Sequence, residues 1–272
     1  MSTRAVIIGA SGRMGQSLLR AARAMPAVAI GAAVVSSASV ALGRDAGELA
    51  GTAPLGVRLS ADLPAALAGA DVAIDFSRPE ACAANLAACR AAGTPLLIGT
   101  TGLPAHLETQ LAEAARHIPL LVAPNTSLGV TLLLELVRTA AQALPVAFDI
   151  EILETHHRLK RDAPSGTALA LARAAGEGRG LSAEEALAGA SERRAGVRRT
   201  GQIGFAVLRG GEVVGEHEVR FLGAGETLVL GHRASDRGLF AQGALTAALW
   251  LAQQRAGRYA MRDILMLNQK LA

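Results

Sequence analysis

Aromatic residues are scarce in this chain of 272 residues, which has one Trp, one Tyr and five Phe. Its 27 Lys and Arg exceed its 23 Asp and Glu by only four. The one dense basic cluster has no aromatic residues interleaved, as a base-stacking surface would need. We therefore expect no nucleic-acid partner and interpret the cluster as a solvated loop, with a crossing to a partner subunit or a substrate lid as alternatives. The cluster consists of Arg193, Arg194, Arg198 and Arg199.

Cysteine is also rare, since only Cys82 and Cys89 are present. On a helix these two residues would share a face two turns apart, too far to form a disulfide. We expect both to be reduced and buried. Residues 1–15 show no secretory signal, so the sequence indicates a cytoplasmic location.

Long apolar runs are missing too. The most apolar stretch, residues 118–136, is interrupted by Pro119, Pro124, Asn125, Gly129 and Glu135. This excludes a transmembrane helix there, and we expect no membrane partner. With 51% hydrophobic residues, the chain can still bury a sizeable core, and its length suits two domains.

The first half alternates short strands rich in Val, Ile and Leu with helices. This alternation predicts a parallel sheet covered on both faces, a Rossmann-like arrangement. Ligands bind at the carboxyl ends of such strands. The predicted strands are 4–8, 28–35, 71–76, 94–99 and 119–123, and the predicted helices are 14–24, 79–92 and 104–117.

The pattern changes after about residue 127. An apolar helix at 128–143 precedes β-like segments at 148–157, 201–209, 212–222 and 226–232, several of them joined by Gly-rich turns, and a helix follows at 239–253. Hairpin-linked strands indicate a mixed sheet. We predict an α/β protein with one domain at 1–127, joined by the C-terminal segment 237–272, and a smaller α+β domain at 128–236.

A glycine-rich turn follows the first strand and opens the first helix. Its G-x-x-G-x-x-G spacing permits a tight turn and a close approach of the backbone to a pyrophosphate at the helix N-terminus. It predicts a dinucleotide site in the first domain, although a structural turn is the alternative. The candidate residues are Gly9, Ala10, Ser11, Gly12, Arg13 and Met14, followed by Gly15.

The end of the second strand carries no carboxylate for the ribose hydroxyls of NAD. Val35 and Ser36 stand there instead, and Ser36 with Ser37 could bind a 2′-phosphate, helped by Arg13 or Arg44. We therefore expect NADPH or NADH, with a slight preference for NADPH.

Two further strand ends carry candidate cofactor residues. At Gly99, Thr100 and Thr101, hydroxyl and amide groups could contact the nicotinamide, although a plain glycine turn is the alternative. The segment Ala123, Pro124, Asn125 and Thr126 could contact the cofactor, cap the following helix, or do both.

The segment 151–168 has the strongest chemical signal. A strand delivers His156 and His157, whose side chains point to opposite faces if the strand continues. Lys160 and Arg161 add positive charge. Ser165, Gly166 and Thr167 then begin a helix, and its free amides suit a carboxylate.

Other chemistries fit this segment poorly. Adjacent histidines on a strand are poor chelators, and no further ligand stands at a spacing such as H-x-x-x-H, so we expect no metal. A hydrolase would need the G-x-S-x-G turn, which is missing. Two structural histidines are the remaining alternative.

The motif E-x-H-H-x-x-K-x-D-A-P-S-G-T-A at 154–168 resembles the signature of the 4-hydroxy-tetrahydrodipicolinate reductase (dihydrodipicolinate reductase) family. The resemblance runs along the whole chain. It includes residues 9–15, 45–48, 75–79, 98–102, 203–205, 214–217 and 261–263.

The resemblance implies NAD(P)H-dependent reduction of a cyclic dicarboxylate in diaminopimelate and lysine biosynthesis. It implies a homotetramer formed through the sheets of the second, substrate-binding domain. His156 would be the general acid or base, and Lys160 a second proton donor or a substrate ligand. His157 would bind substrate, and Gly166 with Thr167 would hold a carboxylate.

Two other functions stay open at this level. The first is a dehydrogenase acting on another amino or imino acid. The second is a non-enzymatic NAD(P) sensor, which would have no use for His156, Lys160 and Thr167 together.

Overall fold

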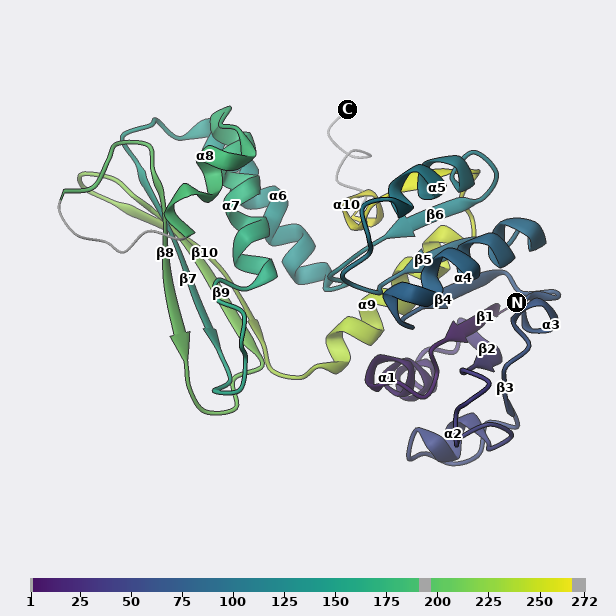
Figure 1. The fold of residues 1–272 in the computed structure, drawn as a ribbon. Coiled ribbons are helices and arrows are strands. Elements are labelled where there is room, and N and C mark those ends of the chain that lie inside the picture. Colours follow the sequence, from purple (N-terminus) through teal and green to yellow (C-terminus); the bar gives the residue numbers. More distant parts are fainter. Residues whose placement is uncertain (1, 191–196, 266–272) are drawn as a thin grey trace. The chain divides into compact units, whose positions relative to one another are not determined.

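The computed structural model describes residues 2–190 and 197–265. It forms two compact units (Figure 1). One contains the described residues up to 127 together with those from 238 onward, and the other contains residues 128–237. The first unit contains a seven-stranded sheet and the second a four-stranded sheet. The predicted α/β class with two different sheets is confirmed.

The sheet of the first unit is parallel throughout, as predicted. Its strand order is β11-β6-β5-β4-β1-β2-β3. The sequence pattern missed β3 and β11, which have two and three residues and are too short to show a periodicity. The strands are β1 (Thr3–Ile8), β2 (Val28–Val34), β3 (Leu59–Ser60), β4 (Val72–Asp75), β5 (Leu96–Ile98), β6 (Pro119–Val122) and β11 (Gly257–Tyr259).

Successive residues of each strand point to opposite faces of this sheet, so its apolar side chains lie on both faces and helices cover them. Val6 and Ile8 of β1 belong to one apolar core with Leu86 and Cys89 of α4. Helix α9 contacts α1, β4 and β5, so this part of the C-terminal segment packs within the first unit. The helices are α1 (Arg13–Ala22), α2 (Ala46–Leu49), α3 (Leu63–Leu67), α4 (Pro79–Ala92), α5 (Leu107–Ala114), α9 (Gly238–Leu251) and α10 (Met261–Ile264).

Both cysteines lie on α4, where they are free and fully buried. Burial, with a contribution from the charge of Asp75, raises the pKa of Cys82 to about 11 and that of Cys89 to about 12. Both thiols are therefore protonated at neutral pH, and the prediction of buried, unbridged cysteines is confirmed.

The sheet of the second unit is mixed, in the order β10-β9-β7-β8. Strand β9 is antiparallel to β10 and β7, whereas β8 is parallel to β7. The elements are α6 (Leu128–Ala143), β7 (Asp149–His156), α7 (Gly166–Arg179), α8 (Ala183–Leu187), the 3₁₀ turn η1 (Ala188–Ala190), β8 (Ile203–Arg209), β9 (Gly215–Leu222) and β10 (Thr227–Ala234).

Burial alternates along β7, where Ile150, Ile152, Glu154 and His156 are all buried. Ile150 and Ile152 belong to the core that α6 and α7 form against the sheet. Because side chains alternate along a strand, Glu154 and His156 point to the same helix-covered face. The fold thus places a carboxylate and an imidazole at one end of an otherwise apolar core.

The interpretation of the basic cluster as a solvated loop is wrong for Arg198. Its guanidinium pairs with Asp149 at 3.0 Å and with Glu151 on β7, and it is largely covered. Arg193 and Arg194 lie outside the described residues. Within the described parts of the chain, no helix is both long and apolar enough to cross a bilayer.

Candidate active site

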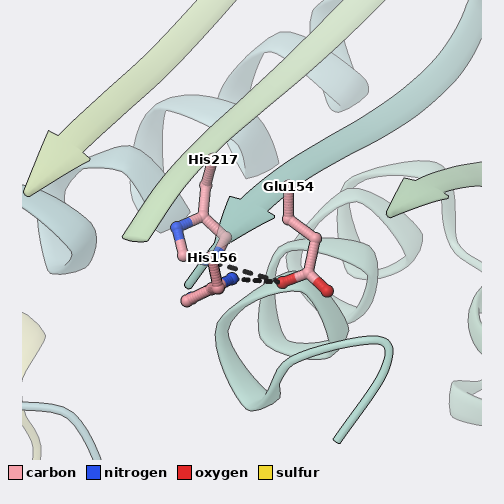
Figure 2. A group of neighbouring side chains, drawn as sticks. All are labelled: Glu154, His156 and His217. Carbon is pink, nitrogen blue, oxygen red and sulfur yellow. Dashed lines mark ion pairs between the residues drawn. The ribbon is translucent and has the colours of Figure 1, made fainter. Parts of the chain in front are cut away.

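Three buried polar side chains meet at the end of β7: Glu154, His156 and His217 (Figure 2). Glu154 on β7 stands directly opposite His217 on β9 in the antiparallel register. Opposed residues of paired strands point to the same face, and His156 joins them because it lies two residues beyond Glu154. The strand pairing therefore assembles the group.

One carboxylate oxygen of Glu154 faces both histidines. Its Oε2 lies 3.2 Å from Nδ1 of His156 and 3.7 Å from Nε2 of His217. The two imidazole rings meet edge to face, with their centroids 5.0 Å apart. Glu154 is thus the shared centre of the group.

The other oxygen, Oε1, accepts two strong hydrogen bonds. The backbone N–H of Ser165 donates at 2.9 Å, and Nη2 of Arg209 donates at 2.9 Å. Burial alone would raise the pKa of Glu154, but the hydrogen bonds from Ser165 and Arg209 outweigh it and lower that pKa. Glu154 is therefore an ionised, buried carboxylate.

Both histidines are held toward their neutral forms. Burial, reinforced by the charges of Lys160 and Arg209, lowers the pKa of His156 against the opposing effect of Glu154. Burial and the neighbouring His156 lower the pKa of His217 to about 4. At neutral pH the group thus carries the negative charge of Glu154 and the positive charge of Arg209.

The same three side chains lie close enough together to hold a metal ion, because one ligand atom from each falls within 4.8 Å of the others. The sequence argument against a metal considered only spacings within one segment and so missed this set. The chemistry nevertheless opposes a cation, since the guanidinium of Arg209 already pairs with the carboxylate and Lys160 is nearby. We assign no metal to it.

The predicted dinucleotide turn is a tight glycine turn between β1 and α1. Gly9 has φ +81°, which favours glycine, and a Cβ on Gly15 would lie 2.3 Å from the carbonyl oxygen of Gly9. Gly12 caps α1 without a side chain, and the first turn of α1 has no acidic residue. The N–H of Gly12 donates to the carbonyl oxygen of Gly9 at 3.0 Å, whereas the first N–H groups of α1, those of Arg13 and Met14, have no intrahelical acceptors and could bind a pyrophosphate.

Both halves of the chain match known families. The family model described as "Dihydrodipicolinate reductase, N-terminus" matches residues 3–126, and the model described as "Dihydrodipicolinate reductase, C-terminus" matches residues 129–265. The chain belongs to the dihydrodipicolinate reductase family.

Relatives within this reductase family match along their whole length. The 4-hydroxy-tetrahydrodipicolinate reductase of Anaeromyxobacter dehalogenans strain 2CP-1 is 49% identical over 266 residues, covering 98% of each chain. That of Alkalilimnicola ehrlichii is 49% identical over 267 residues, covering 98% of this chain and 100% of its own. The family assignment from the 154–168 motif is confirmed.

Solved structures support the fold. The dipicolinate-bound dihydrodipicolinate reductase of Paenisporosarcina sp. TG-14 aligns with a TM-score of 0.76 at 23% identity, covering 96% of this chain and 98% of its own. An amine dehydrogenase from Mycobacterium smegmatis aligns with a TM-score of 0.61 at 13% identity, covering 96% of each chain.

In this reductase, the predicted substrate residues flank the histidine group. His157 lies just beyond β7, where its N–H donates to Val213 and its Nε2 lies 3.1 Å from a guanidinium nitrogen of Arg237. The Nζ of Lys160 lies 2.7 Å from Oδ2 of Asp162. The two histidines therefore differ: His156 is buried, and His157 is partly exposed.

Ser165, Gly166 and Thr167 begin α7 as predicted. Ser165 is the N-cap, and its Oγ accepts the N–H of Ala168 at 3.2 Å and lies 3.1 Å from Nε2 of His217. Gly166 is exposed at the helix N-terminus, where the helix dipole favours an anion. Ser165 thus connects this end of α7 to the histidine group.

The remaining cofactor candidates stand at one edge of the parallel sheet, at the carboxyl ends of β1, β2, β5 and β6. Ser36 is exposed after β2, and its Oγ accepts the N–H of Ala38, whereas Val35 is buried. Ala10 is buried in the first turn and Ser11 is exposed. Pro124 is exposed and Ala123 is buried after β6.

Two predicted hydroxyl groups bond within the protein. Thr100 is buried and donates to the carbonyl oxygen of Asp75 at 3.3 Å, and Thr126 donates to the carbonyl oxygen of Phe240 at 2.7 Å. Gly99 lies under the ring of Phe76, and Thr101 is exposed. The side-chain oxygen of Asn125 accepts the N–H of Ser127 in a turn just before α6.

Sequence reasoning missed the partners of His156. Glu154 could have been found, because the E-x-H spacing on a strand puts both side chains on one face. His217 and Arg209 could not, since their proximity depends on the register of β9 and β8 against β7.

Proposed function

We propose that this chain reduces 4-hydroxy-tetrahydrodipicolinate to tetrahydrodipicolinate with NAD(P)H, a step of diaminopimelate and lysine biosynthesis. The observation that carries the proposal is the buried pair of Glu154 and His156, next to Lys160 and the N-terminus of α7. The relatives that share the chain at 49% identity have this activity in their names.

The 4-hydroxy substrate loses water to give a conjugated C=C–C=N system, and one hydride and one proton then add to that system. A bound nicotinamide supplies the hydride. His156 delivers the proton, because an imidazole can donate near neutral pH. The charge of Lys160 stabilises the negative charge that hydride addition creates on the conjugated substrate, and Lys160 is the alternative proton donor.

A cyclic dicarboxylate needs two anion sites. We propose that the N-terminus of α7 holds one carboxylate through Gly166 and Thr167. The predicted substrate contact of Ser165 is wrong, because this residue is buried and its N–H and Oγ already bond to Glu154, Ala168 and His217. Lys160 and His157 hold the other end of the substrate. Asp162 now neutralises Lys160, and the pairing of these two charges holds the pKa of Asp162 below its usual value.

The first unit is the proposed dinucleotide-binding domain, with Gly9–Met14 at the phosphates. NADPH is the proposed preferred cofactor because the end of β2 has no carboxylate to bind the ribose hydroxyls or repel a 2′-phosphate. The contacts of Ser36 leave it exposed and able to donate a hydrogen bond to such a phosphate.

The second unit is the proposed tetramerisation domain, with a second copy of this chain against its sheet. Thr155 and Leu208 are side by side on the face away from Glu154. The same face carries Arg233 paired with Glu216 at 2.8 Å and Arg220 paired with Glu218. A face with charges of both signs beside apolar residues can pair with the same face of a second copy. A tetramer in sedimentation equilibrium supports this, and a monomer contradicts it.

A cytoplasmic location is proposed on the two protonated, unbridged cysteines.

A substrate panel tests the function. NADPH oxidation should be fast with the cyclic substrate and at least 100-fold slower with other imino acids. A preference for another amino or imino acid would favour a different dehydrogenase. Nucleotide binding without turnover of any substrate would favour a sensor.

A further inference from the structure

The imidazole of His156 presents two different nitrogens to its surroundings. Its Nδ1 lies 3.2 Å from Oε2 of Glu154, and both atoms are buried without an aligned hydrogen bond in the described structure. Its Nε2 lies next to Gly215, where a Cβ atom would come within 3.1 Å of it. The ring thus occupies a space between a buried carboxylate and a backbone without a side chain.

An ionised carboxylate can only accept hydrogen bonds, so it favours a hydrogen over a lone pair on the ring nitrogen that faces it. We propose that Glu154 is the positioning residue of this enzyme: it keeps Nδ1 of His156 protonated in both forms of the ring, so that Nε2 takes up the proton in the imidazolium form and transfers it from there. This inference rests on the proposed function, in which His156 is the proton donor.

Glu154 is suited to this role because hydrogen bonds to its other carboxylate oxygen, Oε1, stabilise its negative charge. Oε1 accepts from Ser165 and from Arg209, each at 2.9 Å, and the side chain is 1% exposed. These two donors leave Oε2 directed at the histidines. Ser165 is also the N-cap of α7, so the proposed carboxylate site and the orientation of His156 depend on the same carboxylate.

Several charged groups surround His156, and Glu154 is the one that most favours its protonated form. If Glu154 loses its charge, the pKa of His156 must fall further, because burial and the remaining cations then act without their main opponent. The groups are Glu154, Lys160 and Asp162 along the chain, Arg209 from β8 and His217 from β9, with His232 on β10 acting on His217.

The test is the pH dependence of kcat in Glu154→Gln, a substitution of nearly equal size. A general acid must be protonated, so the rate falls as pH rises through its pKa. We expect kcat at pH 7 to fall roughly 10- to 100-fold. The alkaline limb of the profile, which is the pH range where kcat falls as pH rises, should move to lower pH, and KM for NADPH should stay unchanged. A residue with a structural role alone would lower Tm and leave the limb in place.

Glu113→Gln is the matched control. Oε1 of Glu113 on α5 lies 3.1 Å from Nε2 of His117, which follows that helix, so the substitution removes the same charge from another carboxylate–histidine pair, an exposed one. Its pH profile should coincide with the wild type. Glu154→Asp keeps the charge, and it should retain the position of the limb with a smaller loss of kcat.

A measurement on the unmodified enzyme covers the case in which the variants do not fold. The ¹⁵N chemical shifts of neutral His156 should identify the Nδ1–H tautomer, and the Nε2–H tautomer would overturn the inference. So would an unmoved alkaline limb in Glu154→Gln. Failure of the proposed function looks different: the wild type would not turn over the cyclic substrate, or His156→Gln would remain active.

Discussion

The hydroxyl oxygen of Ser165 lies 3.1 Å from Nε2 of His217, although the two residues are 52 positions apart. Ser165 begins the helix that would receive a substrate carboxylate, and His217 packs against His156. The proposed binding and proton-transfer sites are therefore linked through the hydrogen bond between Ser165 and His217 and the ring contact between His217 and His156, so changes at one site should affect the other.

Stability should depend on pH through His217. Its pKa is about 4 in the folded state against 6.5 ordinarily, so the unfolded chain binds more protons between these values. Stability therefore falls as pH drops from about 6.5 to about 4, by roughly 3 kcal/mol from this group. Urea unfolding at several pH values should show this loss in the wild type and a smaller loss in His217→Gln. Parallel pH profiles for the two proteins would refute the assignment.

Removing Lys160 should impair both binding and turnover. Lys160→Ala loses the cation proposed to hold the substrate and to stabilise developing charge, so we expect KM for the cyclic substrate to rise and kcat to fall, each about tenfold or more. Steady-state kinetics measure both. Arg158→Ala removes an exposed charge two residues earlier and should behave as the wild type. An unchanged KM in Lys160→Ala would argue against its substrate role.

A methyl group at Gly12 should weaken nucleotide binding without unfolding the protein. A Cβ there would lie 3.2 Å from the carbonyl oxygen of Gly9, a contact that a small shift relieves. We expect the Kd of NADPH, measured by fluorescence, to rise about tenfold or more, since the methyl group crowds the phosphate position. Gly31→Ala on β2, where a Cβ has ordinary contacts, is the control. Equal Kd values for both variants would remove the turn from the cofactor site.

A carboxylate at position 36 should reverse the cofactor preference. Ser36→Asp places at the end of β2 the acidic group that binds ribose hydroxyls and repels a 2′-phosphate. We expect kcat/KM for NADPH to fall and the NADH-to-NADPH ratio to rise at least about tenfold. If the ratio does not move, the 2′ position of the cofactor is bound elsewhere.

Much of the architecture could be predicted from the sequence because buried strands and amphipathic helices have distinct periodicities. Helices α4 and α6 begin and end where the pattern placed them. Strand β9 begins at Gly215, later than predicted, and β7 ends at His156, so that His157 lies outside the strand. Strand ends depend on pairing partners, which a single segment does not reveal.

Only some of the residues of the candidate site could be predicted from the sequence. His156, Lys160 and Ser165 lie in one continuous segment, so their chemistry could be recognised together. His217 and Arg209 come from strands 50 residues or more away in sequence, and the pairing register alone brings them to Glu154. For the same reason, the ligand-like grouping around Glu154 could not be foreseen from spacing.

The most direct test of the central claim is the turnover of His156→Gln with the cyclic substrate and NADPH. Single-turnover measurements should show a rate of reduction about 10²- to 10⁴-fold below the wild type, the usual contribution of a general acid, while the Kd of NADPH stays the same. Near-normal reduction by His156→Gln would contradict the account.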